Sequence, residues 1–355
     1  MKIKSLNARP VLAPMKRPIR TAVGEIPKAP LVLIDVLSDQ NIKGSAYIFA
    51  YTPLTLTPLV AFINNLNELI CAWDYAPAET FEKLRQTFRL LGSQGLVGMA
   101  LSGVEMALWD GLGKSMDQSV VNLLGGVEKD IAAYDSYGIV NLALDGKEIE
   151  ASIDAGFKGV KIKIGAADLQ RDIQAVSTVR QIIGDDVSLM VDYNQSLDAA
   201  EAIHRLQYLK DFNIAWVEEP VHAEDLIGHA RVSDKSGVPV QTGENWWFIE
   251  DMQDAIRTKA CDFAMLDLMK IGGISGWMKA ASLAKTASLP VSSHLFVEAS
   301  AHCLALTPTC HWLEWLDIAS SILQSPQQVV DGYVKPGSPG LGINWNETAI
   351  NKYLI

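Results

Sequence analysis

Short apolar runs recur along the second half of the chain, and a segment with helical periodicity separates each run from the next. The stretch from Ser188 to Ser196 shows the type, since Leu, Met and Val fill it and polar residues end it. Such a run is typical of a strand buried on both faces of a parallel sheet. Because side chains alternate along a strand, Asp192 and Asn194 are expected to point the same way from its carboxyl end. For this stretch alone, an aspartate that caps the next helix is an equally good interpretation.

Eight runs of this type lie in the second half, with helical segments between them. They cover residues 132–136, 159–164, 188–194, 214–218, 239–244, 263–267, 290–294 and 311–314. Eight strand–helix units in this order fit a barrel of alternating strands and helices better than an open sheet. The helix between the last two runs, around 300–306, is expected to be short.

The first part of the chain has a different pattern, in which strands come before helices. Alternating positions predict strands at 2–9, 31–36 and 44–49, and helical periodicity predicts helices at 78–91 and 97–113. Residues 17–28 contain Pro and Gly and are expected to form a loop. We therefore expect an α+β domain over 1–125, a barrel over 126–325, and a segment over 326–355 that returns to the first domain.

The composition is that of a folded soluble protein, since 49% of the 355 residues are hydrophobic and 20% are charged. The net charge of -11 argues against a nucleic-acid partner, because phosphate binding needs basic patches. No apolar run approaches the roughly 18–20 residues that span a bilayer, and the N-terminus lacks the apolar core of a signal peptide. The four cysteines include no CxxC pair. These features predict a cytoplasmic protein with reduced thiols and no membrane partner.

Charged residues stand at the ends of seven of the eight runs. In chain order they are Lys161, Lys163, Asp192, Glu218, Glu244, Asp267, His294 and Glu314. Consecutive run ends are about one strand–helix unit apart, so each of these residues falls at the same level of successive strands. In a barrel that level is the carboxyl-terminal mouth, where catalytic residues gather.

Three of these residues form a candidate metal site. Asp192, Glu218 and Glu244 would converge from neighbouring strands, and carboxylates within about 4–5 Å repel by roughly 4 kcal/mol per pair at an effective dielectric near 20. Such a group either takes up protons or binds a cation. Ligands that are all oxygen favour a hard ion, and Mg²⁺ keeps positions open for water and substrate. The alternative is three separate capping or salt-bridged carboxylates.

The remaining residues are candidates for acid–base chemistry. Lys161 and Lys163 share one face of a strand, and one of them can be neutral near pH 7 and act as a base. Alternating lysines also occur on solvated edge strands. His294 is placed beside Asp267, which would fix its tautomer and steady its charged form, although a lone His is more often a core residue. Glu314 could stay protonated and donate a hydrogen bond to an oxyanion.

Taken together, the motifs resemble those of a known family. They are Lys-Ile-Lys at 161–163, Val-Asp-Tyr-Asn-Gln at 191–195, Glu-Glu-Pro at 218–220, Gly-Glu-Asn at 243–245, Asp-Leu-Met-Lys-Ile-Gly-Gly at 267–273, Ser-Ser-His-Leu-Phe at 292–296 and His-Trp-Leu-Glu at 311–314. The chain resembles the enolase superfamily, and within it the mandelate racemase group, essentially from end to end. Each motif is unspecific alone, whereas the combination is highly specific.

The resemblance implies a modified TIM barrel, (β/α)7β, with an α+β capping domain that the C-terminal tail completes. It implies Mg²⁺ as cofactor on Asp192, Glu218 and Glu244, with a 2-hydroxy carboxylate as substrate. Lys163 would be the base on one face of the substrate. His294, oriented by Asp267, would be the base on the other face.

The resemblance also assigns groups that contact the substrate. Lys161 and Glu314 would stabilise the aci-carboxylate, and Asn194 would contact the α-hydroxyl. The mobile loop of the family matches Ile19–Ile26. The apolar pocket for an aryl ring would consist of Ile19, Ile26, Phe49, Tyr51, Leu295 and Leu316. Relatives form homo-oligomers, often octamers, and the same is expected here.

We therefore expect racemisation of an aryl 2-hydroxy acid such as mandelate. One alternative is dehydration of an acid sugar, against which the Lys-x-Lys pair and the apolar pocket argue. Another is a scaffold without activity. Three departures from the family pattern bear on the substrate: Arg20 in place of an expected His, a poor match over Tyr137–Lys147, and Trp315 in place of an expected Arg. An added cation at Arg20 would favour a more polar substrate.

Overall fold

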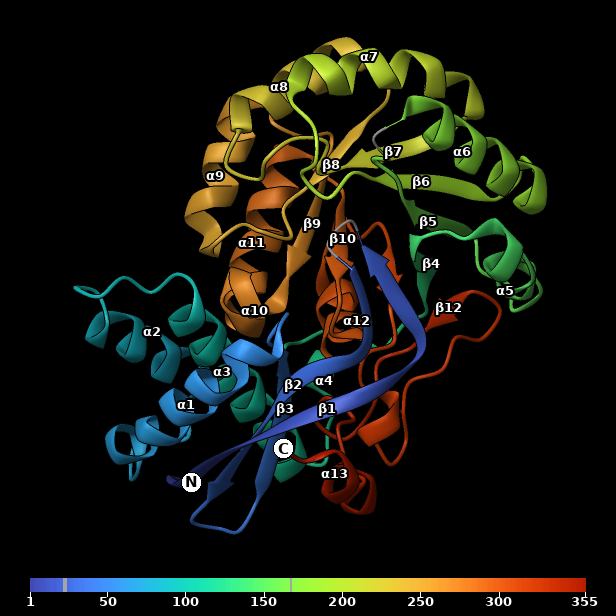
Figure 1. Ribbon diagram of the computed structural model, residues 1–355. Coiled ribbons are helices and arrows are strands. Elements are labelled where there is room, and N and C mark those ends of the chain that lie inside the picture. The colour runs from blue at the N-terminus through green and yellow to red at the C-terminus, as the bar shows by residue number, and fades with distance from the viewer. Residues whose placement is uncertain (22–23, 167) are drawn as a thin grey trace.

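The N-terminal domain is built on three antiparallel strands that follow one another in chain order. A computed structural model describes residues 1–21, 24–166 and 168–355 of the chain. In it β1 (Ile3–Thr21) pairs with β2 (Gly24–Ser38), and β2 pairs with β3 (Lys43–Phe49). The helices α1 (Leu56–Ile70), α2 (Pro77–Thr87) and α3 (Leu96–Ser115) gather beside these strands (Figure 1). The sheet and helices together form the expected α+β domain.

Close contact between α3 and the sheet depends on one glycine. A Cβ at Gly103 would lie 2.4 Å from the Cδ1 of Ile34 and 2.8 Å from the Cγ2 of Ile48, which is closer than side chains tolerate. Because Gly103 has no side chain, α3 packs directly on the buried residues of β2 and β3. This helix is buried along most of its length.

The segment 17–28, which was expected to be a loop, is largely strand. Ile19 pairs with Ile26 in the β1–β2 ladder, after a register shift that follows Pro14. The three prolines of β1 are tolerated because β1 is an edge strand, where a missing N–H breaks no central ladder. Residues 22–23 of the expected mobile loop Ile19–Ile26 lie outside the described residues.

Eight parallel strands form a nearly closed barrel, as predicted. They are β4 (Ile131–Ile139), β5 (Gly159–Lys163), β6 (Ser188–Asp192), β7 (Ile214–Glu218), β8 (Val240–Thr242), β9 (Phe263–Asp267), β10 (Val291–His294) and β11 (Leu313–Trp315). Backbone hydrogen bonds of 2.8 Å from His311 N to Val291 O and 3.0 Å from Ser293 N to Trp312 O close the ring between the last two strands.

Helices follow the barrel strands and cover the outside of the barrel (Figure 1). They are α5 (Leu142–Asp154), α6 (Leu169–Ile183), α7 (Ala199–Leu209), α8 (Leu226–Ser236), α9 (Phe248–Thr258), α10 (Leu268–Ile271), α11 (Gly273–Ala287) and α12 (Val297–Leu306). Short elements outside this repeat are α4 (Val120–Leu123), β12 (Tyr333–Val334) and α13 (Glu347–Tyr353), with 3-10 turns at Pro53–Thr55, Lys210–Phe212 and Ser320–Ile322.

Strand alternation sorts the side chains of β5 between two environments. Val160 and Ile162 belong to the apolar cluster that the strands share with the covering helices. The lysines between and after them face the barrel interior. Inside the barrel, Tyr134, Met190 and Trp216 form a separate buried cluster, with the Tyr134 and Trp216 rings 5.6 Å apart and nearly perpendicular. We call these three residues the aromatic plug.

The C-terminal segment contacts the first domain through hydrogen bonds. Asp110 of α3 accepts from the backbone N–H of Ser45 at 2.7 Å and of Leu341 at 2.8 Å, which joins β3, α3 and the tail at one carboxylate. The Trp345 indole donates to Asp35 of β2 at 2.7 Å. Both chain ends lie near this domain (Figure 1). The exact domain boundaries near 125 and 325 stay predictions.

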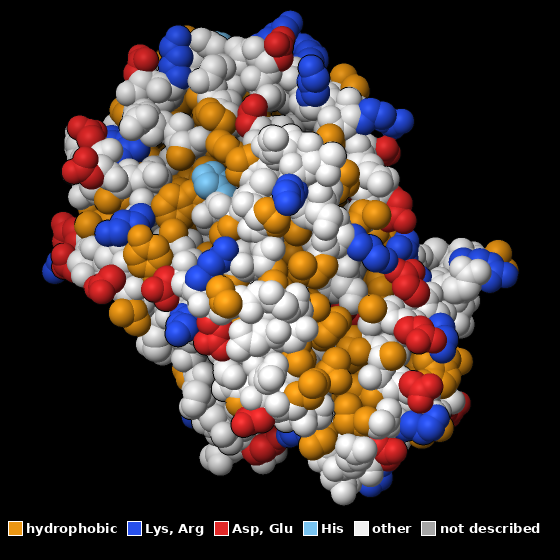
Figure 2. Space-filling model, turned by 180° about the vertical axis from the view of Figure 1, so that it is seen from behind, with side chains coloured by type: hydrophobic (Ala, Val, Ile, Leu, Met, Phe, Trp, Pro, Cys, Tyr) orange, Lys and Arg blue, Asp and Glu red, His pale blue; other side chains and the backbone are white. Residues whose placement is uncertain are grey.

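The surface carries charges of both signs. On the face drawn in Figure 2, Lys and Arg side chains are interspersed with Asp and Glu. Over the described ranges, no helix has both the length and the apolar character needed to cross a membrane. The cytoplasmic location and the homo-oligomer remain predictions.

One buried carboxylate joins the two domains. Glu105 of α3 accepts hydrogen bonds from the first N–H groups of α11, those of Ile274 at 2.9 Å and Ser275 at 2.8 Å, and from the indole of Trp109 at 2.7 Å. These bonds satisfy a helix N-terminus that has no partner within its own helix. Burial nevertheless raises the pKa of Glu105 to about 7.

This pKa predicts a pH-dependent contribution to stability. The folded state holds the Glu105 proton more tightly than the unfolded state, so the contribution is full below about pH 4.5 and is lost as pH rises through 7. Relative to Glu105→Gln, which does not titrate, the wild type should lose roughly 2–3 kcal/mol between pH 5 and 8. Unfolding midpoints of both proteins across this range test it. Glu79→Gln, on the exposed face of α2, is the control, and a stability difference between Glu105→Gln and wild type that stays constant with pH would contradict the prediction.

Candidate active site

The predicted residues meet at the carboxyl end of the barrel. Lys163 is the register partner of Asp192, Asp192 is the partner of Glu218, and Asp267 is the partner of His294. Residues that share a register level on parallel strands stand at one height, so the regular spacing along the chain becomes a ring of charge. Glu244 stands two residues after the end of β8, and Glu314 lies in β11.

Lys161 lies at the centre of the carboxylates. Its ammonium group contacts Glu218, lies 2.8 Å from Glu314 Oε1 and lies 4.0 Å from Asp192 Oδ2. Only 1% of its surface is exposed. Burial opposes the charge of this ammonium, but Glu218 and Glu314 outweigh burial and hold the pKa of Lys161 well above its ordinary value. The surrounding carboxylates therefore favour the charged form of Lys161.

Lys163 donates to Asp192 Oδ2 at 2.5 Å. Burial lowers its pKa, but the Asp192 carboxylate outweighs burial, so the pKa of Lys163 is raised from its ordinary value. The neutral lysine near pH 7 stays a prediction, because a cation bound by Asp192 would oppose the effect of this carboxylate on the pKa of Lys163. The positive charge of the lysines balances the candidate metal ligands.

His294 and Asp267 form the predicted pair. His294 Nδ1 lies 2.6 Å from Asp267 Oδ2, which leaves Nε2 directed toward the site, 3.5 Å from Glu244 Oε2. Asp267 Oδ1 in turn accepts from the backbone N–H of Met269 at 2.6 Å. Burial lowers the pKa of His294, but Glu244 and Asp267 outweigh it and raise this pKa to about 9.

The groups around Glu314 favour its ionised form, and the protonated state expected for its hydrogen bond to an oxyanion stays a prediction. Burial favours the neutral form, but the ammonium of Lys161 and the imidazole of His294 outweigh it and lower the pKa of Glu314 to about 2. Its carboxylate also accepts from Ser136 Oγ at 2.9 Å and from the backbone N–H of Leu295 at 3.1 Å. Spacing along the chain assigned no role to Ser136, although it ends the first barrel strand run and so stands at the mouth.

The residues fit a magnesium ion by chemistry and by charge. The named groups include five carboxylates against two ammonium groups and one imidazole, and burial together with Asp192 and Glu244 raises the pKa of Glu218 to about 7 despite the contact with Lys161. A bound dication would relieve this excess of negative charge. Within the described part of the chain, no three His, Cys, Asp or Glu side chains already enclose an ion position. The ammonium groups of Lys161 and Lys163 contact carboxylate oxygens that a metal ion would bind.

Asn194 departs from the predicted geometry. The strand ends at Asp192, and Asn194 has a left-handed backbone with φ 43°, so strand alternation does not extend to it. Its backbone N–H donates to Asp192 Oδ1 at 2.7 Å, and its side chain is exposed. Its contact with a substrate hydroxyl stays a prediction.

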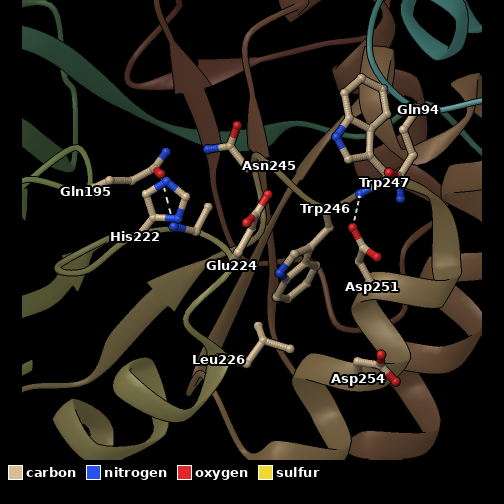
Figure 3. A pocket seen from close by; sticks show the side chains of 11 residues that line it. Gln94, Gln195, His222, Glu224, Leu226, Asn245, Trp246, Trp247, Asp251 and Asp254 are labelled. Atoms are coloured by element: carbon tan, nitrogen blue, oxygen red, sulfur yellow. Dashed lines mark hydrogen bonds between the residues drawn. The ribbon is translucent and has the colours of Figure 1, made fainter.

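Glu219 is a further buried carboxylate, next in the chain to the candidate metal ligand Glu218. Glu219 accepts from Asn245 at 2.7 Å and from Gln195 at 3.0 Å, and burial raises its pKa to about 8. Both amides also line a cavity of about 460 Å³ beside the site, shown in Figure 3 with Trp246 and Trp247. Sequence spacing missed these residues because each shares a motif with a more informative residue, in Glu-Glu-Pro, Gly-Glu-Asn or Val-Asp-Tyr-Asn-Gln.

The residues of the expected apolar pocket differ in how deeply they are buried. The Phe49 and Tyr51 rings lie 4.9 Å apart, and the Lys270 ammonium stands 5.0 Å above Tyr51. Leu295 and Ile19 are buried, whereas Ile26 and Leu316 are half-buried. Trp315, one of the departures, packs near Phe157 with 6.5 Å between ring centres. The pocket as a substrate site stays a prediction.

Removal of one ligand charge should weaken magnesium binding. Asp192→Asn keeps the shape of the side chain but loses the charge, and we expect Mg²⁺ affinity to fall on the order of 100-fold, about 2.7 kcal/mol. Calorimetric titration with MgCl₂ measures it. Glu224→Gln, an exposed carboxylate in the adjacent cavity, is the matched control, and equal affinity of Asp192→Asn and wild type would exclude Asp192 as a ligand.

The chain is similar to proteins of known family over both of its domains. Residues 5–125 match the family model of the mandelate racemase/muconate lactonizing enzyme N-terminal domain, and residues 145–349 match that of the enolase C-terminal domain-like family. An enolase from Bradyrhizobium, crystallised with magnesium and mandelic acid, is 48% identical with a TM-score of 0.98, covering 100% of this chain and 98% of that one.

Two further relatives are more distant. A racemase from Streptomyces coelicolor A3(2) with bound magnesium is 25% identical with a TM-score of 0.92, covering 99% of this chain and 100% of that one. L-talarate/galactarate dehydratase from Salmonella typhimurium is 30% identical over 76% of this chain and 69% of its own length.

Proposed function

The chain belongs to the enolase superfamily, in the mandelate racemase/muconate lactonizing enzyme family, and we propose that it is a two-base racemase of an aryl 2-hydroxy acid. That it is an enzyme of this superfamily and uses Mg²⁺ follows from the family. The reaction type and the substrate are the proposed part.

One observation carries the proposal: two bases reach the same carboxylate cluster from different strands. Lys163 approaches through Asp192 at 2.5 Å, and His294 Nε2 approaches through Glu244 at 3.5 Å. A racemase needs a base on each side of the α-carbon, because the proton must leave one face and return to the other. Around the ring of strands, two strands (β4 and β11) stand between β5 and β10 on one side, and four strands (β6 to β9) stand between them on the other. The strands that carry Lys163 and His294 are therefore not neighbours, and their side chains enter the barrel interior from different sides.

The other groups handle the charge that the reaction creates. An α-proton beside a carboxylate is very weakly acidic, so its removal requires electrophiles at the carboxylate oxygens. Lys161 supplies a buried ammonium there, and Glu314, held by Ser136 and Leu295, can take a proton for a hydrogen bond to the substrate. Magnesium, held by Asp192, Glu218 and Glu244, would supply Lewis-acid stabilisation of the same charge.

An aryl substituent is supported by the side chains near the mouth and by one relative. Phe49, Tyr51 and the buried Leu295 offer apolar surface. The Bradyrhizobium protein, which was crystallised with mandelic acid, is similar over the full chain. We assign the substrate to the same class on these grounds.

Acid sugar dehydration is the second candidate. It is favoured by the relation to L-talarate/galactarate dehydratase, and it would use the same His294–Asp267 pair. A dehydratase expels a β-hydroxyl, so its products are 2-keto acids with changed connectivity, whereas a racemase returns the substrate with an inverted centre.

Product analysis separates the two candidates. With Mg²⁺ present, the purified enzyme should abolish the optical rotation of either enantiomer of mandelate while forming no keto acid, since both bases act on one carbon. Polarimetry measures the first, and a semicarbazide assay on a panel of aldonates and aldarates measures the second. Keto-acid formation with an acid sugar, together with unchanged rotation of both mandelates, would assign the enzyme to the dehydratases.

Removal of one base should slow racemisation but leave α-proton exchange with one enantiomer. His294→Asn keeps a polar side chain of similar size but cannot accept the proton, so racemisation should fall at least about 1000-fold. Exchange of the α-proton in D₂O should survive for the one enantiomer that Lys163 deprotonates, as measured by ¹H NMR. His222→Asn, exposed beside the neighbouring cavity, is the control. Exchange with both enantiomers, or with neither, would contradict the two-base assignment.

A further inference from the structure

Two of the departures from the family pattern contact each other. Nη1 of Arg20 donates to both carboxylate oxygens of Asp145, at 2.9 and 2.7 Å, and Asp145 lies in the poorly matching segment Tyr137–Lys147. The backbones also meet there, since a Cβ at Gly138 would lie 2.4 Å from the carbonyl oxygen of Arg20. The expectation that Arg20 offers a free cation to the substrate is therefore not supported, because Asp145 neutralises it.

A second arginine of β1 makes a parallel contact. Arg17 donates to Asp135 at 2.5 and 3.2 Å and to the carbonyl of Ser136 at 3.0 Å, and its guanidinium lies 3.7 Å from the centre of the Tyr137 ring. Ser152 of α5 donates to the same Asp135 at 2.6 Å. In Figure 1 the far end of the β1–β2 ladder reaches the barrel beside β4.

We propose that Arg17 and Arg20, paired with Asp135 and Asp145, form an arginine clamp that fixes the end of β1 on the barrel and thereby sets the apolar side of the substrate pocket. The clamp residues are positioning residues and touch no reacting atom. The pocket role rests on the proposed function, since it assumes that Ile19 contacts the substrate.

Ser136 connects the arginine clamp with Glu314, one of the candidate acid–base groups. The carbonyl of Ser136 accepts from Arg17, while the hydroxyl of the same residue donates to Glu314 at 2.9 Å. Ile19 stands between the two arginines in the chain and is 7% exposed. A change in the position of β1 would therefore move an apolar wall and the residue that orients Glu314 together.

The burial of the four charges indicates how the clamp must be tested. The side chains of Asp135 and Asp145 are 6% exposed, whereas those of Arg17 and Arg20 are 27% and 31% exposed. Loss of an arginine leaves a buried carboxylate without its partner, which by itself destabilises the protein. A charge swap restores the pairing, so it separates loss of the clamp from general damage.

The experiment compares Arg20→Gln, Arg20→Lys and the swap of Arg20→Asp with Asp145→Arg against the wild type. Hydrogen–deuterium exchange of amides in residues 16–20 and 136–140 is followed by mass spectrometry, and KM and kcat are measured with mandelate. Lys28→Gln, exposed on β2 of the same ladder, is the control.

Arg20→Gln should speed exchange in both segments about tenfold and raise KM about tenfold, with kcat changed less than threefold. Arg20→Lys and the swap should return both quantities to within threefold of the wild type, because a cation again faces a carboxylate. Unchanged exchange in Arg20→Gln would overturn the clamp. Faster exchange with unchanged KM would overturn its role in the pocket. A wild type that does not act on mandelate would count against the proposed function, and the exchange rates would still decide on the clamp.

Discussion

Compensation of buried charge is the constraint on which the site depends. Three carboxylates surround the single ammonium of Lys161, and one of the three, Asp192, also holds Lys163. Buried charges persist only when they are paired, so neither the lysines nor the acids can be replaced singly without a large cost. The same balance is consistent with the proposed binding of a dication and an acid substrate. A bound dication would add positive charge near the acidic groups, and the carboxylate of the proposed substrate would add negative charge near the ammonium groups.

The fold meets this constraint by strand alternation and by register. In β5, Val160 and Ile162 pack toward the helices, while the two lysines face the interior. Register then brings Asp192 and Glu218 to the height of Lys163. Further hydrogen bonds fix the arrangement, because Ser136 and the backbone N–H of Leu295 donate to Glu314, and the amide of Asn245 beside the candidate metal ligands donates to Glu219.

The sequence predicts the barrel and the ring of charges well, because both depend on periodicity that local side chains encode. It predicts less where tertiary contacts decide. Segment 17–28 is largely strand because the β1–β2 ladder resumes after a register shift that follows Pro14, which proline content alone does not reveal. The lowered pKa of Glu314 depends on Lys161 at 2.8 Å, a neighbour that is distant in the chain. The roles of Arg20 and Asp145 are likewise visible only when the two segments meet.

The aromatic plug bears on the route by which a substrate would reach the site. Tyr134, Met190 and Trp216 are fully buried inside the barrel, and the Lys161 ammonium lies 5.5 Å from the Tyr134 ring centre. Because side chains fill the interior of a barrel of this type, a substrate would approach Lys161 from the carboxyl-terminal mouth. Entry of substrate and release of product would then share one route.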